Sequence, residues 1–110
     1  MVGVVHPHLE LTELETITRR EVDMYAGNSF KSNSYFVADD TQKMYVVINV
    51  PDLPRSWLPR VVIMAQVVDD KVIIIEDNTD KPLFEALMVN GGVPREKIIL
   101  AYAGEAVPIT

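Results

Sequence analysis

The sequence predicts an α+β fold: an N-terminal helix, an antiparallel β-sheet of four to five strands, and a crossover helix packed on one face of that sheet. Residues 61–77 hold two β-branched apolar runs on either side of a short Asp-Asp-Lys turn, a pattern typical of a β-hairpin. Residues 32–50 repeat the pattern around a polar turn, which indicates a second hairpin. Residues 9–26 and 83–88 space their apolar side chains as one face of a helix requires. The predicted order of elements is α-β-β-β-β-α-β, with a C-terminal strand after the crossover helix.

The central hairpin is too apolar for a sheet with one solvated face. Residues 61–65 and 72–75 are apolar at every position, whereas a strand with one dry face alternates apolar and polar side chains. The short turn allows only antiparallel pairing, so burial within a parallel sheet does not explain the pattern. We therefore expect a helix of the same chain on one face and a second chain on the other, as in a homodimer or higher homo-oligomer. The candidate interface residues are Trp57, Val62, Met64, Ile73 and Ile75.

The first half of the chain contains an arm, a helix and a hairpin. Residues 1–110 are the length of one ordinary domain, and residues 1–8 are expected to form a flexible arm. Gly27-Asn28 is a plausible stop signal for the first helix, because such residues end helices in the left-handed conformation.

The segment between the two hairpins should be an ordered loop. Three prolines between residues 51 and 59 interrupt regular structure, because proline fixes φ and removes a backbone donor. Leu53, Trp57 and Leu58 are too apolar to be left wholly in water. Trp57 fits two roles equally, an anchor in an interface and a lid over the edge of the core.

The second half ends in a helix and a strand. The polar run at 78–80 supplies N-cap candidates, and Pro82 follows where the first turn of a helix tolerates proline. Residues 90–92, Asn-Gly-Gly, should end this helix, because glycine adopts the left-handed conformation there. Residues 97–102 read as the last strand.

Composition disfavours several classes of partner and chemistry. The formal net charge is −6, and Arg19-Arg20 is the only basic pair, so direct tight nucleic-acid binding is not expected. If the chain did bind DNA, Arg19, Arg20 and Lys31 would carry the contact. There is no cysteine, which excludes disulfides and thiol catalysis. The N-terminus lacks a signal-peptide pattern and no apolar run approaches the roughly 18 residues of a membrane span, so we expect a cytoplasmic protein without membrane contact.

The titratable residues suggest no enzyme. The only histidines, His6 and His8, lie in the expected arm and are better explained as solvated than as metal ligands. Asp39-Asp40, Asp69-Asp70 and the group Glu76, Asp77 and Asp80 each fall where a turn or a helix cap is expected, and turn chemistry explains them best. The last group is the basis of an alternative reading, a small divalent-metal-binding domain or enzyme. Otherwise no catalytic residue, metal or cofactor is expected.

The second half also resembles a known family. An apolar strand at 61–68 is followed by the turn Asp69-Asp70-Lys71, a strand at 72–76, a Thr-Asp helix start and the ending Gly-Val-Pro-Arg-Glu-Lys-Ile-Ile-Leu-Ala-Tyr at 92–102. This order is similar to the XisI-like family, small proteins named for control of excision of the fdxN element in cyanobacteria. The resemblance covers roughly residues 34–102, with residues 60–102 as the family-like core.

The resemblance implies a function that the residues alone do not give. It implies an α+β domain that acts with a companion, the XisH-like protein, in controlling a DNA rearrangement. It implies no known catalytic residue. The expected function is therefore that of a non-enzymatic accessory factor working through protein–protein contacts.

Overall fold

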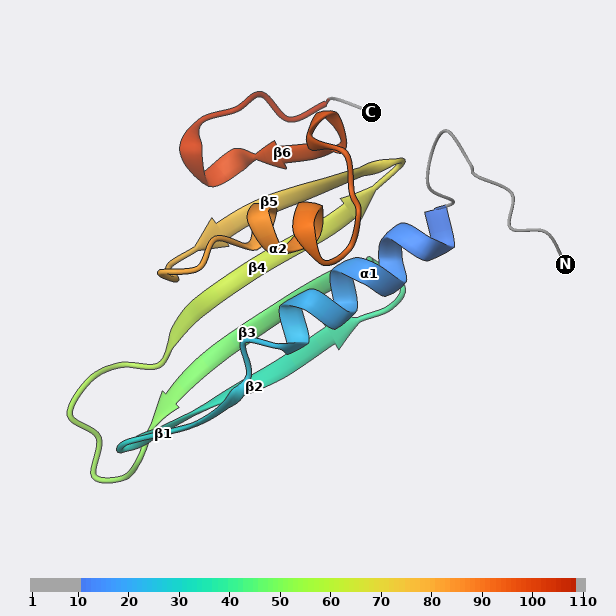
Figure 1. The fold of residues 1–110 in the computed structure, drawn as a ribbon. Helices are drawn as coiled ribbons and strands as arrows, with labels where there is room; N and C mark the ends of the chain where they lie inside the picture. Colours follow the sequence, from blue (N-terminus) through green and yellow to red (C-terminus); the bar gives the residue numbers. More distant parts are fainter. Residues whose placement is uncertain (1–10, 109–110) are drawn as a thin grey trace, which may run out of the picture.

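A six-stranded β-sheet with its strands in sequential order, β1-β2-β3-β4-β5-β6, is the framework of the chain (Figure 1). The computed structural model describes residues 11–108, so the predicted arm at 1–8 lies outside the described residues. Neighbouring strands are antiparallel from β1 to β5, and the last pair, β5 and β6, is parallel. The strands are β1 Gly27–Ser29, β2 Ser32–Asp39, β3 Met44–Pro51, β4 Arg60–Val68, β5 Lys71–Asp77 and β6 Ile98–Leu100.

The α+β class is confirmed, with two corrections to the sheet. It has six strands where four to five were expected, because Gly27–Ser29, taken as a helix stop, turns back and pairs with β2. Lys31 takes the left-handed conformation, with φ of 66°, in the tight turn between them. The last strand is shorter than predicted and parallel to β5, because the crossover through the second helix returns the chain in the direction of β5.

Two helices cover one face of the sheet (Figure 1). Helix α1 spans Leu11–Asp23 and helix α2 spans Leu83–Val89. Their inward side chains and those of the central strands form one buried cluster. Its largest fully buried members are Leu14, Val22, Tyr45, Val47, Ile63, Val72, Ile74, Leu83, Leu87, Val93 and Ile98.

The two ends of α2 are stabilised differently, by a side-chain hydrogen bond at the start and by a left-handed glycine after the end. The predicted N-cap run at 78–80 does not cap the helix, because Pro82 is the N-cap residue and makes no side-chain bond. Instead, the Leu83 amide donates to Asp77 Oδ2 at 2.8 Å, which satisfies one of the free amides of the first turn. The predicted C-terminal stop is confirmed: Gly92 has φ of 68°, and its amide donates to the Met88 carbonyl at 3.2 Å.

The opposite face of the sheet carries no helix of the described chain. Strand alternation puts Tyr35, Val37, Met64 and Ile73 on this face, which we call the outer face. Ile73 is only 5% exposed, whereas Tyr35 and Val37 are 53% and 50% exposed. The expected helix cover is therefore confirmed on one face. The second cover, from another chain, stays a prediction.

Two short 3-10 turns complete the described chain. They are η1 at Arg95–Lys97 and η2 at Ala101–Ala103, on either side of β6. Within residues 11–108, no helix has the length and apolar character needed to cross a bilayer.

The close approach of the two helices predicts the effect of a single methyl group. A Cβ at Gly91 would lie 2.4 Å from Ile17 Cγ2 and 2.7 Å from the Leu87 carbonyl oxygen. We expect Gly91→Ala to lower the free energy of unfolding by about 1–3 kcal/mol through overpacking, measured by urea denaturation. Asp23→Ala, at an exposed site of α1, is the control and should change it by less than about 0.5 kcal/mol. Equal effects of the two substitutions would contradict this packing.

Candidate functional site

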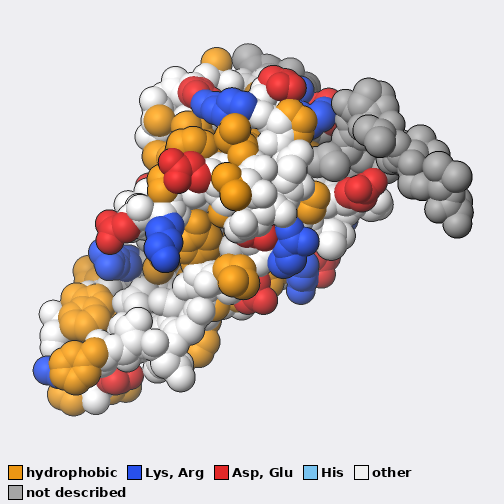
Figure 2. All heavy atoms as spheres, viewed as in Figure 1, with side chains coloured by type: hydrophobic (Ala, Val, Ile, Leu, Met, Phe, Trp, Pro, Cys, Tyr) orange, Lys and Arg blue, Asp and Glu red, His pale blue; other side chains and the backbone are white. Residues whose placement is uncertain are grey.

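The sheet extends beyond α1 and ends in a projecting surface, which we call the tip. The tip consists of Phe30 and Lys31 in the β1–β2 turn and residues 52–58 in the loop between β3 and β4 (Figure 1). It lies at one end of an elongated molecule, with principal extents of 54 × 35 × 27 Å. Apolar side chains gather at this end in the space-filling view (Figure 2).

A buried amide fixes the tip to the sheet. Trp57 Nε1 donates to Asn49 Oδ1 at 3.2 Å, and Asn49 Nδ2 donates to Ser32 Oγ and Ser34 Oγ, both at 3.1 Å. Asn49 is 8% exposed. The loop therefore has a defined position, as the sequence predicts, and part of the Trp57 ring stays exposed.

The tip exposes several large apolar side chains. Leu53 and Leu58 are 87% and 67% exposed, so the described chain alone does not shield them from water. Phe30, which was not among the predicted interface residues, is 86% exposed, and Lys31 Nζ lies 5.2 Å from its ring centroid. The only sequence signal was an aromatic residue beside a lysine at a turn.

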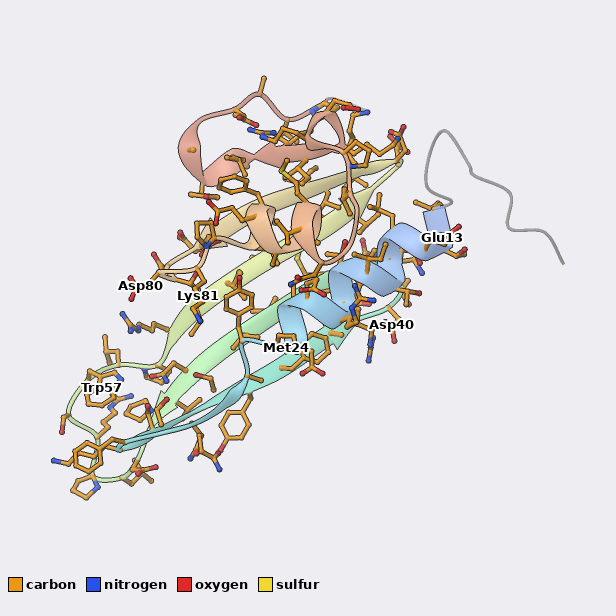
Figure 3. The ribbon with its side chains drawn as sticks, viewed as in Figure 1. Glu13, Met24, Asp40, Trp57, Asp80 and Lys81 are labelled. Atoms are coloured by element: carbon orange, nitrogen blue, oxygen red, sulfur yellow. The ribbon has the colours of Figure 1, made fainter. Side chains whose placement is uncertain are left out.

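A second feature is a groove between the two helices, which we call the helix groove. It has a volume of about 560 Å³. Met24, Asp80 and Lys81 come from the end of α1 and the loop before α2, which border it (Figure 3). The lining residues are Glu21, Met24, Tyr25, Asp80, Lys81, Pro82, Glu85, Ala86, Val89 and Asn90.

The floor of the helix groove is held by buried polar groups. Glu21 is 5% exposed, and its carboxylate accepts from Arg20 Nε at 2.9 Å and from Asn90 Nδ2 at 3.2 Å. The Tyr25 hydroxyl donates to the Lys81 carbonyl. Burial, followed by the nearby Asp77 carboxylate, raises the pKa of Tyr25 to about 12, so the hydroxyl keeps its proton at neutral pH.

Asp39 and Asp77, one from each of two acidic groups, are occupied by structural contacts. Asp39 Oδ1 accepts from the amides of Thr41 and Gln42 at 3.0 and 3.1 Å. Asp77 accepts from the Thr79 amide at 3.0 Å as well as from the first turn of α2. Within residues 11–108, no group of three or more His, Cys, Asp or Glu side chains is placed to hold a metal ion. The alternative metal site at residues 76–80 therefore gains no support from the geometry.

The basic residues do not converge on one face for phosphate. Arg19 pairs with Asp40 and lies 5.3 Å from the Phe36 ring centroid, and Arg20 pairs with Glu21. Lys31 lies at the tip. His6 and His8 fall outside the described residues.

The five predicted interface residues fall in three places. Trp57 belongs to the tip, and Val62 packs against the core beneath the helices. Met64, Ile73 and Ile75 alternate with core residues of their strands and so belong to the outer face.

Loss of the Asn49 amide should release the tip. Trp57 is the only tryptophan, so its fluorescence reports on this loop alone. Asn49→Ala should shift the Trp57 emission to the red, increase acrylamide quenching and lower the free energy of unfolding by about 1–3 kcal/mol, because three polar partners lose their bonds. Ser34→Ala removes one of these bonds and should have a smaller effect. Unchanged quenching in Asn49→Ala would show that other contacts hold the loop.

Asp70 should contribute to stability at neutral pH and lose that contribution in acid. Its carboxylate contacts Lys97 Nζ at 3.0 Å and Lys71 Nζ at 3.2 Å, and these contacts lower the pKa of Asp70 from 3.8 to about 2. Because the folded pKa is below the unfolded one, the contribution is complete above about pH 4 and disappears as the pH falls through about 2. Asp70→Asn should therefore flatten the acid-induced decrease of the unfolding temperature.

The control for Asp70 is its neighbour. Asp69→Asn leaves both lysine contacts in place. The unfolding temperature of this variant should therefore fall in acid as much as that of the unchanged protein. If Asp69→Asn flattens the acid response as much as Asp70→Asn does, the two lysine contacts are not its source.

Comparison with known proteins gives consistent results. The sequence profile of a family described as XisI protein matches residues 11–108. A XisI-like protein from Anabaena variabilis ATCC 29413, solved by crystallography, superposes with a TM-score of 0.72 at 26% identity, over 83% of this chain and 85% of that chain. No curated protein matches the chain.

A second solved structure supports the fold alone. The fdxN element excision controlling factor XisI from the same organism superposes with a TM-score of 0.57 at 17% identity, over 84% of this chain and 88% of that chain.

The family match extends from α1 through η2, so it includes both helices and all six strands. The chain belongs to the XisI protein family.

Proposed function

We propose that this chain is a controlling factor for excision of a DNA element and acts through protein contacts, with an XisH-like protein as its partner. Membership of the XisI family supports the first part, because one similar structure is described as an fdxN element excision controlling factor. The proposal includes action in the cytoplasm, no catalysis by this chain, and self-association as a homodimer.

The observation that carries the proposal is the apolar outer face. Tyr35 and Val37 are half exposed there, next to the β3 and β4 side chains of the same face. Exposed apolar side chains grouped on one face of a sheet favour a protein–protein contact. We assign this face to the XisH-like partner.

Charge and local geometry support contact with protein more than contact with DNA. The formal net charge is −6, and Arg19 and Arg20 already pair with carboxylates of the chain. Phosphate contacts would have to replace these internal pairs. The acidic side chains Asp39 and Asp77 similarly serve turns and a helix end, which favours a non-enzymatic role over the metal-dependent alternative.

Co-purification tests this function. The chain should form a stable complex with the XisH-like protein of its own genome when the two are co-expressed, measured by size exclusion with light scattering. Tyr35→Ser combined with Val37→Ser should weaken the complex about tenfold or more, since buried apolar anchors dominate protein interfaces.

Two controls make this test specific. Glu13→Ala, an exposed site at the start of α1, should leave the affinity unchanged. The chain alone should give no gel shift with duplex DNA at low salt, where phosphate contacts are strongest. Failure of the unchanged chain to bind the XisH-like protein would reject the proposal.

A further inference from the structure

The most exposed large apolar side chains occur at only two sites of the described chain. Five such residues are more than 60% exposed between residues 11 and 108. Three of them, Phe30, Leu53 and Leu58, form the tip, and two, Met24 and Val89, border the helix groove. One site projects and the other is hollow, which docking of one into the other requires.

The helix groove has the size to receive side chains of the tip. Its volume of about 560 Å³ lies within the range of about 300–1,000 Å³ typical of pockets that enclose a ligand. Aromatic and aliphatic anchors that fill such a pocket contribute most of the energy of an interface. Phe30 and Leu53, both almost fully exposed, are anchors of this kind.

The charges of the two sites are complementary as well. The tip carries Lys31 and Arg55 against one carboxylate. In the groove, Glu21 is paired with Arg20, whereas Asp80 and Glu85 face a single lysine. Within residues 11–108, none of Lys31, Arg55, Asp80 and Glu85 has an ion-pair partner of the same chain. Opposite charges around an apolar contact favour one orientation and accelerate association.

We propose that the tip of one copy of this chain docks in the helix groove of a second copy, and that the second copy returns the same contact. The inference rests on the homodimer of the proposed function and specifies the surface that forms it. A chain's own tip is held away from its groove by the Asn49–Trp57 bond and by the bond from the Asp52 amide to the Lys31 carbonyl, 2.8 Å long. Figure 3 places Trp57 beyond Asp80, Lys81 and Met24, toward the end of the molecule.

The proposed contact can form a closed dimer because each chain supplies one tip and one groove. In a two-fold dimer both tips and both grooves are used, and no site is left to recruit a third chain. The expected solution species is therefore a dimer with twice the monomer mass.

A charge exchange between the two sites tests this contact. Lys31→Glu with Arg55→Glu makes the tip acidic, and Asp80→Lys with Glu85→Lys makes the groove basic. Each double variant alone places like charges together and should weaken self-association about tenfold or more, measured by sedimentation equilibrium. An equimolar mixture should restore dimers to within about threefold of the unchanged protein, because both contacts of the mixed dimer again join opposite charges.

The controls separate the contact from folding and from other surfaces. All four substitutions are at exposed sites without ion pairs in the described chain, so the thermal unfolding curves should stay cooperative. Phe30→Ser should weaken the dimer as the tip charge variant does. Val107→Ser removes a half-exposed apolar side chain elsewhere and should not.

The outcomes distinguish this inference from the function on which it rests. If both charge variants dimerise as well as the unchanged protein, the tip–groove contact is wrong and the homodimer forms through another surface. If the unchanged protein is a monomer at every concentration, self-association itself is wrong. A mass that keeps rising with concentration would reject the closed two-fold form.

Discussion

Burial of one face of strands β3, β4 and β5 beneath α1 and α2 is the constraint on which the other features depend. Helix α2 has only seven residues, too few to be stable in water without packing. Its position is therefore set by the apolar sheet under it and by the Asp77 carboxylate at its first turn. Helix α1 packs over β2, β3 and β4, and α2 packs beside it over β5, so the groove between the two helices exists only when this face of the sheet is covered.

The same packing explains which elements could be predicted from the sequence. Apolar periodicity indicated both helices and the four long strands, because those residues serve the core wherever the chain places them. Strand β1 was missed because Gly27, Asn28 and Ser29 have low strand propensity and form a strand only by pairing with β2. The acidic turns were interpreted correctly at Asp39, since an aspartate bonds the amides that follow it.

The candidate surfaces were harder to predict because they depend on the lengths of the strands relative to the helix that covers them. Exposure of Phe30 and Leu53 follows from how far β2 and β3 extend beyond α1, and no local pattern encodes that difference. The helix groove likewise combines Met24 with Val89, which are far apart in the sequence. Trp57 was noticed as an isolated aromatic residue, but its bond to Asn49 required the three-dimensional arrangement.

The edges of the sheet narrow the ways in which this chain can bind another protein. At β6, Arg95 Nη1 donates to the Ile98 carbonyl at 2.6 Å, and the Leu100 amide donates to Glu105 Oε1 at 2.8 Å. These bonds occupy backbone groups that an added strand would need, so sheet extension at β6 is blocked. At the other edge, β1 pairs only with residues 32–34 of β2. The outer face and the helix groove lie on opposite sides of the sheet, so the proposed contacts with an XisH-like protein and with a second copy would use different surfaces of the chain.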